Sequence, residues 1–165
     1  MSASCVPDDF PVGSGPTQAT DNGASSSGLR LGWDMLTERE NHAVSARNGK
    51  LTCRVWRRRD IGIERGAELA RLLADELESY FKTADKIRGF VFDLRDAPAV
   101  SGPVTQTAIS NILISAERFH VRIAVVVGPG ALQAMQIRRL TRECAPSCGV
   151  VMTELLEAED WAWKK

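Results

Sequence analysis

The sequence predicts a single α/β domain in which helices pack on a mixed, mostly parallel sheet of about four to five strands. Two observations lead to this fold class. Asn48-Gly49 is a strong β-hairpin signal, because both residues tolerate the positive φ of a type I′ turn. After the hairpin, segments with apolar residues at helical spacing alternate with short, continuously apolar runs that are typical of buried strands. This alternation favours parallel strands joined by right-handed helical crossovers.

Each element is expected from its local pattern. Leu51, Cys53 and Val55 alternate with other residues after the hairpin and indicate a strand. Residues 64–84 carry leucines at three- and four-residue steps, which predicts the clearest helix. Further elements are expected in the order strand 87–94, helix 103–119, strand 122–127, helix 131–144, strand 149–153 and a final helix from about Glu154.

The chain divides into three parts by composition. Residues 1–30 are rich in Ser, Gly, Pro, Thr and Asp and have few apolar side chains to bury, so we expect a disordered tail. Residues 31–46 are interpreted as a linker or an added edge element. The folded domain is expected over residues 47–165.

Charge and hydropathy exclude several classes of partner. The 21 basic residues balance 21 acidic ones, so no overall field attracts nucleic acid, and the run Arg57-Arg58-Arg59 is interpreted as a solvated corner. The longest apolar runs are far too short for membrane insertion. The N-terminus lacks the basic start and apolar stretch of a secretory signal, so a cytoplasmic location is expected.

Residues with catalytic or metal-binding chemistry are sparse. Cys144 and Cys148 form a C-x3-C pair, but there is no second pair, and the chain has two histidines, so no metal or other cofactor is expected. No Walker motif or G-x-S-x-G is present. The sequence therefore favours a protein that is not an enzyme.

Three motifs carry a family resemblance. They are Val91-Phe92-Asp93-Leu94-Arg95-Asp96 at the end of an expected strand, the strand at residues 122–128, and Glu157-Ala158-Glu159-Asp160-Trp161 in the closing helix. On these motifs residues 49–163 resemble the STAS domain, the sulfate-transporter and anti-sigma-factor-antagonist family, and particularly its SpoIIAA-like branch. The resemblance implies a bacterial regulatory domain that works by binding another protein.

The resemblance also implies a phosphorylation switch at an Asp-Ser-Ser-Gly type motif. Here that place is Ala99-Val100-Ser101-Gly102-Pro103, so the switch is degenerate. Ser101 is the nearest hydroxyl. It is either a phosphosite or a cap of the following helix.

Two further groups of residues are candidate binding sites. At about 100° per residue, the helix at 131–144 has two apolar arcs, of which the one with Ala134, Ile137, Leu140, Thr141 and Cys144 is expected to face the core. The other arc is a candidate partner-binding surface unless the final helix covers it; it consists of Leu132, Met135, Arg138, Arg139 and Arg142. At a strand end, Asp93, Arg95 and Asp96 form either a ligand site or local ion pairs.

The sequence thus predicts a protein-interaction module in bacterial signalling, of STAS-like type, with a degenerate switch. One alternative is a small-molecule or lipid-binding domain of STAS/SEC14-like type, which would require an apolar cavity of several hundred Å³ near the strand ends. Another alternative is a structural assembly subunit, which would require a large self-complementary apolar surface.

Overall fold

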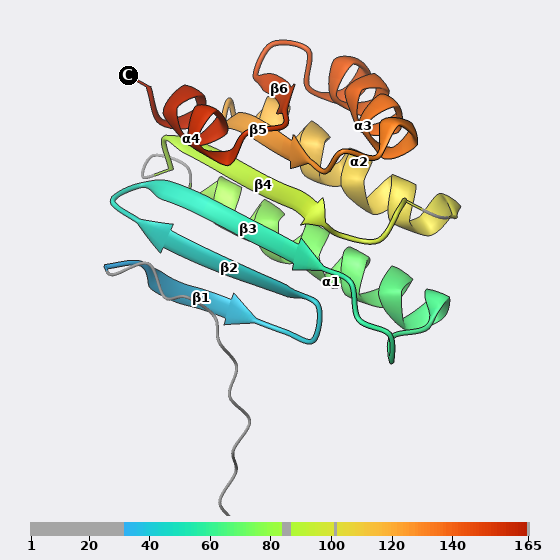
Figure 1. The fold of residues 1–165 in the computed structure, drawn as a ribbon. Coiled ribbons are helices and arrows are strands. Elements are labelled where there is room, and N and C mark those ends of the chain that lie inside the picture. The colour runs from blue at the N-terminus through green and yellow to red at the C-terminus, as the bar shows by residue number, and fades with distance from the viewer. Residues whose placement is uncertain (1–31, 84–86, 101, 165) are drawn as a thin grey trace, which may run out of the picture.

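The computed structural model describes residues 32–83, 87–100 and 102–164. The expected tail at 1–30 lies outside these residues. Within these residues, ten elements follow one another (Figure 1): β1 Asp34–Glu38, β2 His42–Arg47, β3 Lys50–Trp56, α1 Ile63–Lys82, β4 Gly89–Asp96, α2 Pro103–Arg118, β5 Arg122–Val127, α3 Ala131–Cys144, β6 Gly149–Met152 and α4 Leu155–Trp163. The structure therefore confirms the α/β class.

The strands form one mixed sheet in which spatial order equals chain order, from β1 to β6. β1 and β2, and β2 and β3, pair antiparallel, whereas β3 to β6 are parallel. The expected hairpin is present, with Arg47 opposite Lys50 and with positive φ at Asn48 (50°) and Gly49 (77°). The two-residue turn is the physical reason why β2 and β3 keep their register.

In the part of the chain that the structure describes, the sheet has six strands, so the expected count of about four to five was too low. The additional strand is β1, which lies in the segment interpreted as a linker or an added edge element. Its burial shows no alternation, because four of its five residues are exposed and Thr37 is half-buried. β1 is held in the sheet by its pairing with β2, which has a register shift between Met35 and Thr37. The Thr37 hydroxyl also lies 2.8 Å from the Tyr80 hydroxyl on α1.

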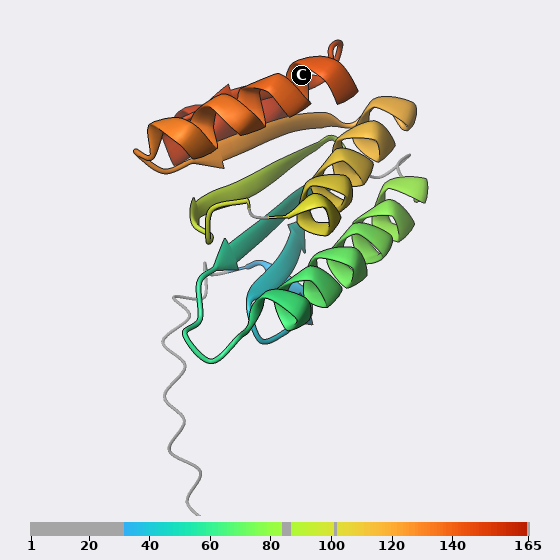
Figure 2. The same cartoon turned by 90° about the vertical axis from the view of Figure 1, so that its right-hand side faces the viewer.

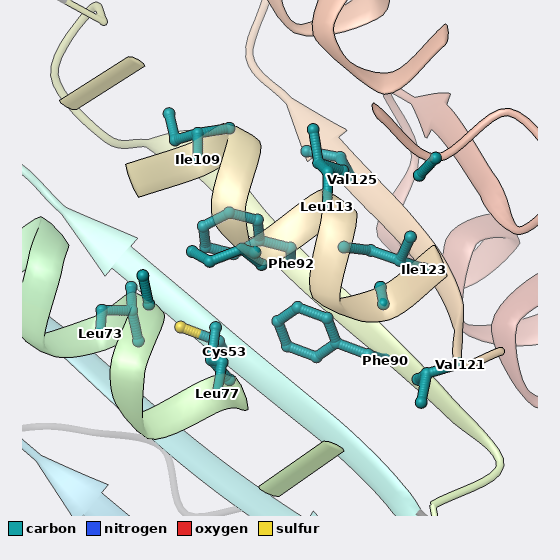
Figure 3. Packing of buried hydrophobic residues seen from close by; sticks show 14 of the residues in the cluster. Cys53, Leu73, Leu77, Phe90, Phe92, Ile109, Leu113, Val121, Ile123 and Val125 are labelled. Carbon is teal, nitrogen blue, oxygen red and sulfur yellow. The ribbon is translucent and has the colours of Figure 1, made fainter. Parts of the chain in front are cut away.

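Helices cover both faces of the sheet (Figures 1 and 2). α1 and α2 lie side by side on one face, and α3 joins the same buried cluster near the β6 edge. Figure 3 shows part of this cluster, in which side chains from β3, β4, β5, α1 and α2 meet between the helices and the sheet. Phe90 packs against Phe81 and Phe92 with ring centroids 5.3 and 5.6 Å apart. None of the helices in the described ranges is long and apolar enough to span a membrane.

α4 packs on the opposite face of the sheet. Its Ala158 and Ala162 form a second buried cluster with Val91, Ala124 and Val126. The helix approaches β4 so closely that a β-carbon at Gly89 would lie 2.0 Å from the carbonyl oxygen of Ala162. A glycine is therefore needed at the start of β4 for α4 to take this position.

Candidate functional site

An apolar cavity of about 450 Å³ lies between α1, α2 and the sheet, at the carboxyl ends of β3 and β4. In open α/β sheets this end is the usual place for ligands, and the volume falls within the roughly 300–1,000 Å³ of small-molecule sites. The cavity is therefore the candidate functional site.

The inner wall of the cavity is apolar and buried. It consists of Leu69 and Leu73 from α1, Phe92 and Leu94 from β4, and Ala108, Ile109 and Ile112 from α2. These residues belong to the stripes that the helical and strand patterns direct toward the core. The space exists because small residues occur on these stripes near the first turns of both helices: Gly66 and Ala70 on α1, and Ala108 on α2.

The cavity opens between two loops. Its exposed lining residues come from the β3–α1 connection, including Arg57 and Gly62, and from the β4–α2 connection, including Pro98 and Ala99. The backbone N–H of Arg57 donates to the carbonyl oxygen of Asp96 at 2.8 Å and so holds the two loops side by side. β3 and β4 finish at the same end of the sheet (Figure 1), and the residues that line the opening lie at that end.

Two polar side chains in the cavity wall keep unsatisfied atoms. Nε2 of Gln133, in the first turn of α3, is buried and has no hydrogen-bond partner among the described residues. Nε2 of His42 is in the same condition, 3.8 Å from Oε2 of Glu76. Nδ1 of His42 lies 2.9 Å from Oδ1 of Asn41, and because an amide oxygen only accepts, Nδ1 carries the proton.

His42 is 1 % exposed, and this burial lowers the pKa of its imidazole below the usual value. The carboxylate of Glu76 opposes the shift, but burial is the larger effect. A buried imidazole with a lowered pKa is neutral near pH 7. The polar part of the wall therefore offers an amide donor and a neutral imidazole.

The strand-end candidates lie outside the cavity wall and are joined in ion pairs. Asp93 is 6 % exposed and accepts hydrogen bonds from Nε and Nη2 of Arg95 at 2.9 and 2.8 Å. Asp96 accepts from Nη2 of Arg54 on β3 at 2.7 Å. The two carboxylates thus already have guanidinium partners, and the structure does not bring Asp93, Arg95 and Asp96 together around a pocket.

Ser101, the candidate cap or phosphosite, lies outside the described residues. The helix begins at Pro103 as expected, and the N-cap position is occupied by Gly102, with φ of 85°. A residue without a side chain therefore occupies the position that a capping hydroxyl would take.

The helix α3 has the two faces that its sequence predicts. Ile137, Leu140 and Thr141 are buried, whereas Leu132 is 70 % and Met135 67 % exposed. The final helix does not cover this face, because α4 packs on the opposite side of the sheet, in the second buried cluster. Three exposed arginines of the same helix complete the candidate partner surface: Arg138, Arg139, which approaches Glu143 at 3.7 Å, and Arg142.

The cysteines do not form a metal centre within the described ranges. Cys53, Cys144 and Cys148 are free thiols, and no group of three or more His, Cys, Asp or Glu side chains there is placed to hold an ion. Burial, with a smaller effect from Glu117, raises the pKa of Cys148 to about 12. That thiol is therefore protonated and unreactive at neutral pH.

Sequence reasoning did not predict the cavity, nor that Gln133, His42 and the arginine run line it. The available signal was the presence of Gly66, Ala70 and Ala108 on core-facing stripes otherwise filled by leucine and isoleucine. Neither protein-family models, nor curated proteins, nor solved structures give a match to this chain. The geometry of the site is thus what bears on function.

Proposed function

We propose that this protein is a small-molecule-binding domain that takes an apolar ligand into the cavity between α1 and α2. The observation that carries the proposal is a cavity of about 450 Å³ with buried apolar walls and an opening at the carboxyl ends of β3 and β4. This is the feature that the small-molecule alternative required. Cavities of this kind bind ligands mainly by removing apolar surface from water.

The proposed role is binding rather than catalysis. The cavity wall has one histidine and, among the residues described, no aspartate, glutamate or cysteine. Asn41 orients the His42 ring, but Nε2 has no hydrogen-bond partner among the described residues, so no nucleophile lies within hydrogen-bond reach of it. A STAS-like identity and a cytoplasmic location belong to the same proposal; the first rests on the sequence motifs and the second on the character of the N-terminal residues.

Binding of a neutral fluorescent dye such as phenylnaphthylamine tests the proposal. We expect saturable fluorescence enhancement with the folded protein. Ala108→Leu places a larger side chain in the cavity wall and should weaken dye binding by about tenfold or more. Ala116→Leu is the matched control, because Ala116 is a buried alanine of the same helix that does not line the cavity. Equal binding by both variants, or no binding at all, would contradict the proposal.

A second candidate function is the protein-interaction module of bacterial signalling that the STAS resemblance implies. It is favoured by the exposed pair Leu132 and Met135, with Arg138 and Arg142 on the same helix making no ion pair within the described part of the chain. Methionine adapts to varied partners, and arginine is enriched at interfaces. Capture experiments with the double variant Leu132→Ser/Met135→Ser test this role: loss of one defined partner supports it, and unchanged capture contradicts it.

A further inference from the structure

The cavity has one charged end, and this asymmetry bears on the chemistry of its ligand. The inner residues are hydrocarbon, whereas Arg57, Arg58 and Arg59 line the opening consecutively and are all exposed. No aspartate or glutamate lines the cavity among the residues that the structure describes. The lining of the opening therefore carries an excess of positive charge.

The nearby carboxylates are already engaged by other arginines. Asp60 binds Arg58, with Oδ1 2.9 Å from Nε, and Glu40 binds Arg65. Asp96 binds Arg54, as described above. Arg57 and Arg59 are left without an ion pair to any described residue, so two guanidinium groups at the opening remain available to a ligand.

A third donor comes from α3. Nε2 of Gln133 is buried in the cavity wall without a hydrogen-bond partner among the described residues. A buried donor without a partner costs free energy, and a ligand that carries an acceptor would recover it. Arginines at the opening and an amide in the wall both require a ligand with acceptor oxygens.

We propose that the cavity binds an anionic amphiphile, with its alkyl chain between α1 and α2 and its acid group at Arg57 and Arg59. This inference rests on the proposed function, since it assigns the ligand class of the same cavity. Guanidinium groups bind carboxylates and phosphates through charge-assisted hydrogen bonds. A cationic amphiphile is disfavoured by the same charges, and a neutral hydrocarbon leaves Gln133 unpaired.

Displacement of the neutral dye by three ligands with one alkyl chain tests the headgroup. Decanoate carries a carboxylate, decyl phosphate a phosphate and decanol a neutral hydroxyl. At low ionic strength we expect the acid ligands to displace the dye at concentrations about tenfold below that of decanol. The stronger of the two acids identifies the headgroup. The difference in displacing concentration between the acids and decanol should shrink as salt is added, because salt screens the charges of exposed arginines.

The double variant Arg57→Gln/Arg59→Gln should remove the advantage of the acids and leave decanol unchanged. The matched control Arg138→Gln/Arg142→Gln removes the same charge from α3, away from the cavity, and should keep the advantage. Equal displacement by decanol and the acids in the unaltered protein overturns the anionic headgroup but leaves the cavity as a binding site. Absence of dye binding overturns both proposals.

Discussion

A larger side chain on α2 that points into the cavity should stabilise the protein if the cavity is empty space in solution, and destabilise it if the helices close that space. Ala108 is 2 % exposed and lines the cavity, so Ala108→Leu adds an isopropyl group at the wall. In a well-packed core such a change forces neighbouring side chains out of their rotamers and costs about 1–3 kcal/mol. Beside an open cavity of about 450 Å³ the added carbons have room.

The expected gain follows from the added atoms. Three buried carbon atoms contribute about 2.4 kcal/mol at about 0.8 kcal/mol each. Fixing the leucine rotamer costs about 0.5–1 kcal/mol. The free energy of unfolding should therefore rise by about 1–2 kcal/mol.

Urea unfolding followed by tryptophan fluorescence measures this change, since Trp33, Trp56, Trp161 and Trp163 all lie in the described fold. Ala116→Leu is again the control. Ala116 is fully buried and outside the cavity, so this variant should lose about 1–3 kcal/mol. If Ala108→Leu is destabilised as much as Ala116→Leu, the helices fill that space in solution and the reasoning is wrong.

Three further predictions follow from the described contacts. Because burial lowers the pKa of His42 below 6.5, the imidazole takes up a proton at a higher pH in the unfolded chain than in the folded protein. The free energy of unfolding should therefore fall as the pH drops from about 6.5 toward 5. His42→Gln should flatten this part of a plot of the urea midpoint against pH. Leu132→Ser/Met135→Ser should change the unfolding free energy by less than about 0.5 kcal/mol per site, and a loss of several kcal/mol would show that this face is covered in solution. Gly89→Ala should lower the melting temperature markedly, because its β-carbon would meet the Ala162 carbonyl; an unchanged melting temperature would mean that α4 does not hold its position against β4.

Much of the fold was predictable because its patterns are local. The hairpin depends on two residues with positive φ, and the strand Arg122–Val127 was expected with the bounds that it has. The segment that contains β1 was predicted only as a linker or an added edge element, because four of the five residues of β1 are exposed. An exposed edge strand has no buried face, and so no alternation of apolar residues marks it in the sequence.

The site was harder to predict because a cavity is a property of facing elements. The spacing of Leu69 and Leu73, or of Ile109 and Ile112, fixes which side of each helix turns inward. It does not fix how far apart the two helices lie, nor that Ala108 faces a space. The exposure of the large apolar residues Leu132 and Met135 on α3 was predictable, since a helical wheel alone separates them from the core arc.

The outer edge of β1 bears on how the molecule behaves at high concentration. The sheet ends there in a row of backbone donors and acceptors that a strand from another molecule could extend. The register shift beside Leu36 interrupts that row, and the charged residues Asp34 and Glu38 stand at its two ends. A strand from another molecule would have to form backbone hydrogen bonds along an irregular edge, and the carboxylates of Asp34 and Glu38 would be desolvated. The irregularity of β1 thus works against fibre-like growth of the sheet from molecule to molecule.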